Sequence, residues 1–379
     1  MSQLNQPAHP TFYQPDPVAD RFIHHWLFAD LLPWQQAAWD YMTGKFPRLP
    51  HALLFAGNAG TGKRAFVYRF VAWALCQHKT QNTHGVATAC GTCESCQWLL
   101  ANTHPNLYQL PAPIIQHETA KTTKSSNKTS SAAVKLQDEA PTHQVAATIK
   151  IDDIRALQPF VQQSSEGLRL VVIHQAEAMT LGASNALLKT LEEPADNVLM
   201  LLISDTPSQL LPTIRSRLQS VEVSRVSPEQ SLNFMTHQLP QADVLDLKQV
   251  SHLSGCAPFV AMDMIHSHWY QHRQTWLSSW QAIRAYSRTP LQASDYWQKN
   301  LTLSDFLYLS QLMLTEVGEQ LSGLGGGQAD ININVLTPMP SLLAIYELQQ
   351  MVEQIWQDRR QHIQDKLCYD KLLFAMQAH

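Results

Sequence analysis

Long hydrophobic runs are absent from this chain of 379 residues. A helix that crosses a membrane needs about 20 consecutive apolar residues, so we expect no membrane span and no membrane partner. The first 20 residues are polar and rich in proline, and they contain no apolar core of a secretory signal. We therefore expect a cytoplasmic protein.

Charged residues are also scarce, at 15% of the chain. Lys and Arg number 27 against 31 Asp and Glu, so the net charge is −4. A chain that binds nucleic acid alone usually carries excess positive charge. A stand-alone, zinc-dependent DNA-binding module is therefore the least favoured function. The six cysteines of a long cytoplasmic chain favour metal ligands or free thiols over disulfides.

The length predicts two to three domains, and two segments differ from the rest in composition. Residues 1–25 read as a flexible N-terminal arm. Residues 111–148 have no aromatic side chain and are crowded with Ser, Thr and Lys. Such a segment buries too little apolar area to offset the entropy of ordering it, so we predict a disordered insertion.

Short apolar runs predict buried strands near 51–57, at 168–173 and at 198–204. Helices are predicted at 63–76 and 183–194. Apolar strands that alternate with helices are typical of an α/β fold with a parallel sheet, which is covered on both faces.

The remainder of the chain lacks strand patterns after about residue 223 and reads as helical. Its last stretch, 342–376, carries apolar residues at helical spacing. Another helix is expected after Ile149, entered at Asp152 or Asp153.

The strongest local motif, GNAGTGKR, follows the first predicted strand. Gly57, Gly60, Gly62 and Lys63 match a phosphate-binding loop, in which backbone N–H groups surround phosphates and lysine reaches them. The next position should carry a hydroxyl for Mg²⁺, and Arg64 stands there instead. A glycine-rich turn without any ligand is the competing interpretation.

The acidic residues expected after a neighbouring strand are also missing. A phosphate-loop NTPase holds Mg²⁺ with an Asp at this place, whereas here His174 and Gln175 follow the strand. Glu177 lies further along, where we expect a solvated or capping acid. Two independent metal positions are thus lost, which disfavours ATP hydrolysis.

Four cysteines follow the phosphate loop in a C-x13-C-x2-C-x2-C pattern: Cys76, Cys90, Cys93 and Cys96. Thiolates so spaced are typical of tetrahedral Zn²⁺, and four of them leave no open position, which makes the metal structural. An iron–sulfur cluster and free thiols are the alternatives. Possible substitute ligands are His78, His84 and His104.

The segment TIRSRL contains Ser216 and Arg217. A Ser-Arg pair alone most often belongs to a solvated surface, so this motif gains meaning only from its surroundings.

Taken together, five segments resemble clamp-loader subunits of bacterial DNA polymerase III, which are AAA+ proteins. In chain order they are HALLFAGNAGTGK, the four-cysteine module, THPNLYQL, NALLKTLEEP and LLPTIRSR. The resemblance is strong over about residues 30–225. The defective nucleotide site is similar to the delta-prime type of subunit rather than to the ATP-hydrolysing tau/gamma type.

This resemblance implies a RecA-like AAA+ α/β domain over 26–223, with a zinc module inserted at 76–96. A small helical lid (224–270) and a helical collar (271–379) would follow. The collar would join a hetero-pentamer with tau/gamma and delta subunits, at the replisome on the nucleoid. The sliding clamp and primer–template DNA would be reached through that complex.

The resemblance also implies roles for the motifs. The phosphate loop would be a relic in which ATP binding is doubtful, and the chain would be an accessory subunit without ATPase activity of its own. Ser216 and Arg217 would form an arginine finger offered in trans to a neighbouring ATPase. The alternative is an active, tau/gamma-like ATPase with unusual metal ligands.

The chain departs from the family pattern at two further places. Leu218 replaces the usual cysteine after the finger, which we expect to change only packing. The second sensor arginine is missing, and Phe259 and Val260 lie near its expected place.

Overall fold

The computed structural model describes residues 27–28, 30–82, 85–111, 148–163, 167–223, 225–323, 331–359 and 364–379. The predicted arm (1–25) and nearly all of the predicted insertion (111–148) lie outside these ranges. The chain divides into two compact units, residues 1–226 and 227–379, and each is described by itself.

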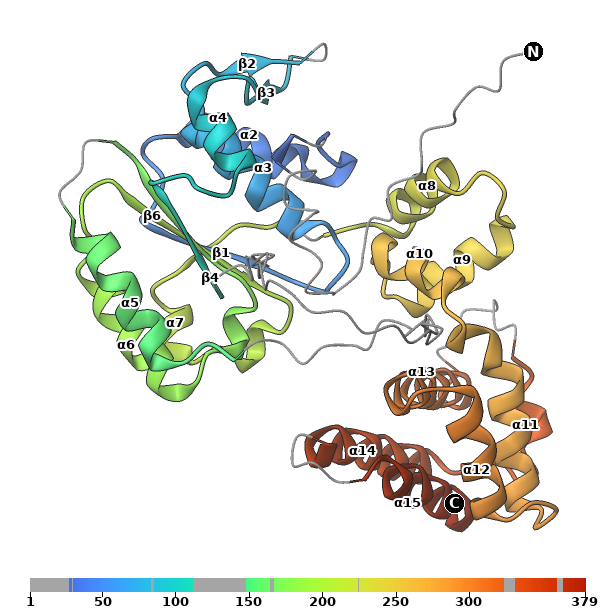
Figure 1. Ribbon diagram of the computed structural model, residues 1–379. Helices are drawn as coiled ribbons and strands as arrows, with labels where there is room; N and C mark the ends of the chain where they lie inside the picture. Colours follow the sequence, from blue (N-terminus) through green and yellow to red (C-terminus); the bar gives the residue numbers. More distant parts are fainter. Residues whose placement is uncertain are drawn as a thin grey trace, which may run out of the picture. The chain divides into compact units, whose positions relative to one another are not determined.

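The first unit is built on a five-stranded sheet in which every pairing is parallel (Figure 1). Across the sheet the strands are β4 (Leu107–Leu110), β5 (Arg169–Ile173), β6 (Val198–Ser204), β1 (Ala52–Ala56) and β7 (Gln219–Ser220). The predicted parallel α/β core is therefore confirmed.

Successive residues along each central strand enter two different cores. In β1, Leu53 and Phe55 pack with one set of helices, whereas Ala52 and Leu54 pack with another. Side chains of a strand point alternately to its two faces, so both faces of the sheet are buried. This explains why the strands read as continuous apolar runs.

Helices from the two halves of the unit cover the two faces. The first core takes its helical side chains mainly from α2 (Gln36–Lys45) and α3 (Lys63–Leu75). The second takes them from α5 (Ile151–Gln162), α6 (Leu181–Glu192) and α7 (Pro212–Arg215). Short 3-10 turns occur at η2 (Pro33–Gln35), η3 (Ala176–Ala178) and η4 (Pro207–Gln209).

One local prediction for this unit is wrong, and one strand was missed. Helix α5 begins at Ile151 rather than at an aspartate. The side chain of Asp153, in the first turn of the helix, accepts a hydrogen bond from the backbone N–H of Lys150, the residue before the helix (2.7 Å). Strand β7 was not predicted, although Val221 and Val223, which are buried, alternate with polar residues just after it. That alternation was the available signal.

Among the described residues of the second unit, every regular element is a helix or a short 3-10 turn. Its helices are α8 (Pro228–Gln238), α9 (Val244–Leu253), α10 (Pro258–His266), α11 (Arg273–Arg284), α12 (Pro290–Asn300), α13 (Leu303–Leu321), α14 (Leu342–Arg359) and α15 (Asp365–Ala378). The turns are η5 (Trp269–His272) and η6 (Ile333–Val335). The helical C-terminal part is thus confirmed, whereas its division into a lid and a collar at residue 270 stays a prediction.

The predicted apolar stretch 342–376 forms two helices rather than one. The ion pair of Lys371 with Asp358 (2.9 Å) and the contact of His379 with Glu347 (3.3 Å) show that α14 and α15 run antiparallel. Helical periodicity continues through both, so it does not reveal the break between them.

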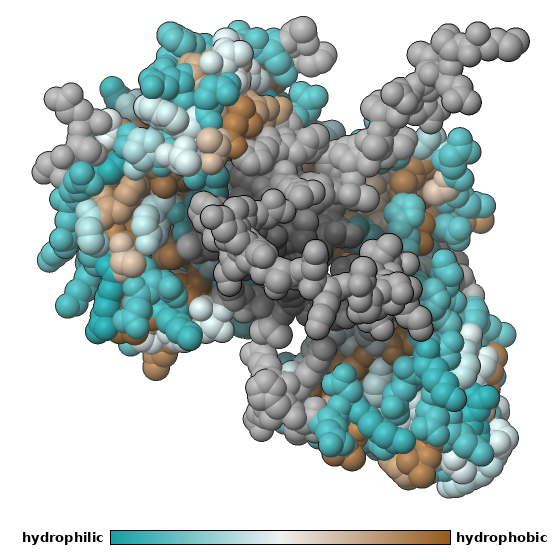
Figure 2. All heavy atoms as spheres, viewed as in Figure 1, coloured by the Kyte–Doolittle hydropathy of each residue, from teal (hydrophilic) through white to brown (hydrophobic). Residues whose placement is uncertain are grey.

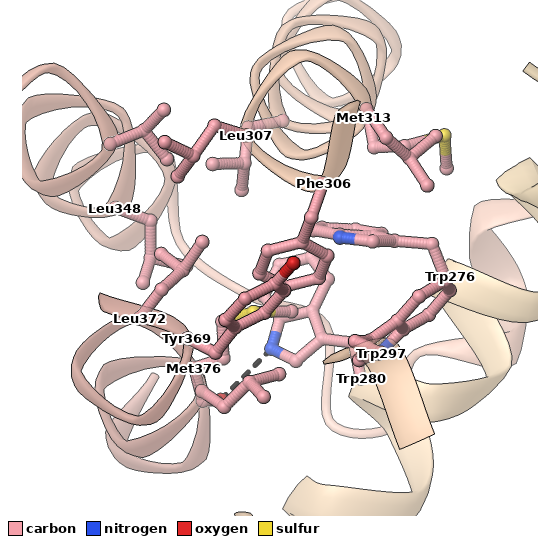
Figure 3. Close-up of a cluster of buried hydrophobic side chains, with 14 of the residues drawn as sticks. Trp276, Trp280, Trp297, Phe306, Leu307, Met313, Leu348, Tyr369, Leu372 and Met376 are labelled. Carbon is pink, nitrogen blue, oxygen red and sulfur yellow. Dashed lines mark hydrogen bonds between the residues drawn. The ribbon is translucent and has the colours of Figure 1, made fainter. Parts of the chain in front are cut away.

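Aromatic side chains lie among leucine and methionine side chains in the core formed by α11 to α15 (Figure 3). Trp276, Trp280 and Trp297 are fully buried, and each indole N–H has an acceptor. Trp280 donates to the Met376 carbonyl (2.9 Å), which ties α11 to α15. A buried indole without such a partner would be costly.

The visible described surface is mostly hydrophilic, and apolar residues occur on it in small groups (Figure 2). Within the described ranges, no helix is both long and apolar enough to cross a membrane.

We predict that Trp280→Ala destabilises the second unit by about 3–5 kcal/mol, because it empties a packed site and leaves the Met376 carbonyl unpaired. Urea unfolding of the full chain, followed by far-UV circular dichroism, would measure this. Leu343→Ala is the control, because Leu343 is 65% exposed and its change should stay within about 0.5 kcal/mol. Equal midpoints for the two variants would contradict the prediction.

Candidate functional site

The predicted phosphate loop connects β1 to α3. Gly57, Gly60 and Gly62 have φ angles of 140°, 72° and 83°. Side chains other than glycine rarely adopt this left-handed region, so the glycines allow the backbone to turn tightly before the helix. The four residues of the predicted nucleotide motif therefore lie together, with Lys63 at the first position of α3.

Lys63 is only 3% exposed, and its ammonium group points back into its own loop. Its Nζ donates to the carbonyls of Gly57 (2.7 Å) and Asn58 (2.6 Å). The third partner is the carboxylate of Asp205, with Oδ1 at 2.6 Å. Asp205 directly follows β6. The sequence did not predict its pairing with Lys63.

The preceding segment holds the other side of the loop. The indole of Trp34 donates to the Thr61 carbonyl (2.9 Å), and the Gln35 side-chain amide donates to the Gly62 carbonyl (3.1 Å). Both side chains are buried. Side chains of η2 thus bind two carbonyls of the loop, and Lys63 binds two others.

His174 follows β5, at the place where a metal-binding carboxylate was expected. Burial lowers its pKa well below the usual range, and the positive charge of Arg64 lowers the pKa further. The structure therefore brings the two substituted metal positions near each other. Mg²⁺ prefers oxygen ligands, which neither a guanidinium nor an imidazole supplies.

A short hydrogen-bond chain fixes the His174 ring. Its Nε2 lies 2.6 Å from the Tyr68 hydroxyl, and the two rings stack with centroids 5.2 Å apart. Tyr68 donates in turn to Gln109, whose amide donates to Asn102 (3.0 Å). Since the Tyr68 proton goes to Gln109, His174 is the donor at Nε2. Its lowered pKa keeps the ring neutral near pH 7.

Glu177 lies in η3 and links two loops. Its Oε1 accepts the backbone N–H of Asp205 (3.0 Å). The expectation of a solvated or capping acid is therefore wrong, because Glu177 positions the loop after β6 instead.

Ser216 and Arg217 lie just after α7, on the surface. Arg217 is 36% exposed and donates to the Thr213 carbonyl (2.9 Å) and to the Ser216 hydroxyl (3.3 Å). It also pairs with Glu192 at the end of α6 (2.7 Å). These contacts orient the guanidinium without burying it.

The residues at the two departures from the family pattern pack against apolar neighbours. Leu218 is half-buried against the core beneath α6 and α7. Phe259 is buried in α10 and contacts Phe234 edge-on, with ring centroids 5.5 Å apart.

The four predicted metal ligands come together beside α3. Cys76 ends that helix, and the other three cysteines lie between the β2–β3 ribbon (Thr80–Gln81, Ala87–Thr88) and α4 (Glu94–Leu100) or within α4. All four sulfur atoms lie within 4.8 Å of one another. Four cysteines this close could bind one metal ion.

The sulfur separations fit a single ion. Cys76 lies 3.5 Å from Cys90 and 3.9 Å from Cys93, and Cys90 lies 4.0 Å from Cys96. Four bonds of about 2.3 Å in a tetrahedron place the sulfurs about 3.8 Å apart. Thiolates that each bind a different iron of a cluster would lie further apart, which disfavours the iron–sulfur alternative.

The substitute histidines do not join this cluster among the described residues. His104 has both ring nitrogens engaged, by Ser95 (2.9 Å) and by the Asn106 N–H (3.0 Å). His84 lies outside the described residues.

The chain is similar in sequence to known proteins. A family model described as "DNA polymerase III, delta subunit" matches residues 38–227. The chain belongs to that family. A DNA polymerase III subunit delta' of Pseudomonas aeruginosa is 36% identical over 62% of this chain and 61% of its own length. The resemblance to delta-prime subunits is therefore confirmed.

Other relatives include both types of subunit. A delta' subunit of Yersinia pestis is 34% identical over 51% of this chain and 45% of its own length. A tau/gamma subunit of Haemophilus influenzae is 28% identical over 52% of this chain and 23% of its own length. The chain thus spans less than two thirds of these relatives' lengths.

We predict that Cys93→Ser lowers the metal content of the purified chain from about one ion to well below half, because a closed site needs every thiolate. Elemental analysis after dialysis would measure this. Cys256→Ser, which lies outside the cluster, should leave the metal content unchanged. Equal metal content in both variants would contradict a four-thiolate site.

The stability of the first unit should depend on pH through His174. Below pH 6.5 the unfolded chain protonates this histidine, whereas the folded chain, with its lowered pKa, does not. The free energy of unfolding should therefore fall by up to about 1.4 kcal/mol per pH unit below pH 6.5. Urea titrations from pH 7.5 to 5 would measure it.

The comparison with His174→Gln isolates this contribution, because other histidines titrate in both chains. The variant should lose less stability than the original chain between pH 6.5 and 5. His237→Gln, at an exposed position, should keep the original dependence. Parallel curves for all three proteins would refute the assignment.

Proposed function

We propose that this chain is a non-hydrolysing clamp-loader subunit of DNA polymerase III. In this role it offers Arg217 to the ATP site of a neighbouring subunit and helps to load the sliding clamp onto primed DNA. The observation that carries the proposal is the contrast between two cations: Lys63 is buried in its own loop, whereas Arg217 is held at the surface.

Arg217 suits a finger role because its present partner is weakly bound. Glu192 is 49% exposed, and exposed ion pairs contribute only about 0–1 kcal/mol. The γ-phosphate of a neighbour's ATP carries more charge and matches the planar guanidinium fork. Exchange of Glu192 for that phosphate therefore costs little, while Thr213 and Ser216 keep the side chain aimed.

The chain's own nucleotide site lacks the parts that hydrolysis requires. Arg64 and His174 stand at both metal positions, and Lys63 has its donors engaged internally. Phosphoryl transfer relies on a metal ion to neutralise charge on the phosphates. We therefore infer that this subunit has no ATPase activity and that ATP binding is not part of its role.

The metal at the four cysteines is proposed to be structural Zn²⁺, bound by Cys76, Cys90, Cys93 and Cys96. Four thiolates close its coordination shell. The ion would hold the β2–β3 ribbon and α4 against the end of α3, in the same unit as the phosphate loop.

The partners follow from the same assignment. Residues 271–379 would form the collar that joins tau/gamma and delta subunits in a hetero-pentamer, and residues 224–270 the lid. Clamp and primer–template DNA would be contacted through the assembled complex. The site of action would be the cytoplasmic replisome.

The finger role is tested in the reassembled complex with Arg217→Ala. We expect DNA-stimulated ATP turnover at the adjacent site to fall by at least about ten-fold, since an arginine finger contributes roughly 10³–10⁵ to turnover. Single-turnover hydrolysis with labelled ATP is the measurement.

Arg215→Ala is the matched control, because Arg215 is exposed in the same turn and should leave turnover unchanged. If Arg217→Ala behaves like this control, the finger role is wrong. Hydrolysis by the isolated chain that Lys63→Ala abolishes would favour the alternative, an active tau/gamma-like ATPase.

A further inference from the structure

Lys63 of the phosphate loop forms an ion pair with Asp205. Asp205 lies outside the phosphate-loop motif, directly after β6. We propose that Asp205 is an internal counter-ion that takes the place of a nucleotide phosphate at Lys63 and keeps the loop closed to nucleoside di- and triphosphates. The proposal deepens the non-hydrolysing role proposed above and rests on it.

The donors of Lys63 are fully used. An ammonium group has three N–H donors, and Lys63 has three acceptors at 2.6–2.7 Å in Gly57, Asn58 and Asp205. A phosphate can reach this group only by displacing one of them. The carbonyls belong to the loop itself, so Asp205 is the partner that a phosphate must replace.

Burial makes the exchange unfavourable. Lys63 is almost inaccessible, and a buried cation needs a counter-charge. Asp205 supplies that charge while remaining 33% exposed, so it keeps part of its own hydration. An entering phosphate would replace one anion by another and would then lie beside the displaced carboxylate, which repels it.

Neighbouring contacts hold both partners in place. The carboxylate of Glu177 accepts the backbone N–H of Asp205. The loop that carries the Asp205 carboxylate is therefore anchored. Trp34 and Gln35 bind the carbonyls of Thr61 and Gly62 and hold the phosphate loop in the same shape. The ion pair therefore joins two anchored loops, at the ends of β1 and β6.

The test measures ADP binding to the isolated full chain by titration calorimetry. Asp205→Asn keeps the shape of the side chain and removes its charge. We expect this variant to bind ADP at least ten-fold more tightly than the original chain. The double variant Lys63→Ala/Asp205→Asn should lose that gain, because the freed lysine supplies it.

Asp196→Asn is the matched control, since it removes an exposed charge just before the other end of β6 and should leave ADP binding unchanged. If Asp205→Asn binds ADP no more tightly than the original chain, the proposal is overturned. It is equally overturned if the double variant keeps the gain, because the effect would then not pass through Lys63.

Lys63→Ala alone provides a test should Asp205→Asn fail to fold, which thermal melting would reveal. An occupied lysine contributes nothing to ADP binding, so this change should alter the affinity by less than two-fold. A ten-fold loss would overturn the proposal. These measurements use the isolated chain, whereas the Arg217 comparison uses the complex, so either idea can fail without the other.

Discussion

The candidate site depends on the hydrogen bonds and the ion pair that the buried ammonium group of Lys63 makes. A cation in a dry environment must find its hydrogen bonds and its counter-charge nearby. In a nucleotide-binding loop the phosphates supply both. Here two loop carbonyls and Asp205 do so. The loop is therefore complete without a ligand, and its neighbours are arranged to keep it so.

The parallel sheet explains how residues from distant segments meet at this place. In the central strands β1, β5 and β6, apolar side chains bury both faces, so polar residues stand only at the ends of these strands. The carboxyl ends of β1, β5 and β6 lie at one edge, where the sequence brings Lys63, His174 and Asp205. In nucleotide-binding proteins this arrangement of strand ends forms the nucleotide site. In this chain it brings together the neutral ring of His174 and the ion pair of Lys63 with Asp205.

The surface cation of the proposed finger, Arg217, lies elsewhere in the same unit. Arg217 is oriented by Thr213 and Ser216 and balanced by a solvated carboxylate. Its charge is permanent, and its surface pair is weak enough to exchange. The first unit thus holds one cation paired inside a loop and another at the surface, and this contrast supports the proposed role.

Local features were readable from the sequence alone. Apolar runs between helices indicated the parallel sheet, and the cysteine spacing indicated the four-cysteine cluster. Single positions showed that a hydroxyl and a carboxylate were missing. Only the tertiary structure decided that Asp205 and Glu177 act on the loop, that Tyr68 fixes His174, and where the last helices separate. Periodicity and motifs report on neighbours along the chain, whereas these contacts join distant segments that only packing brings together.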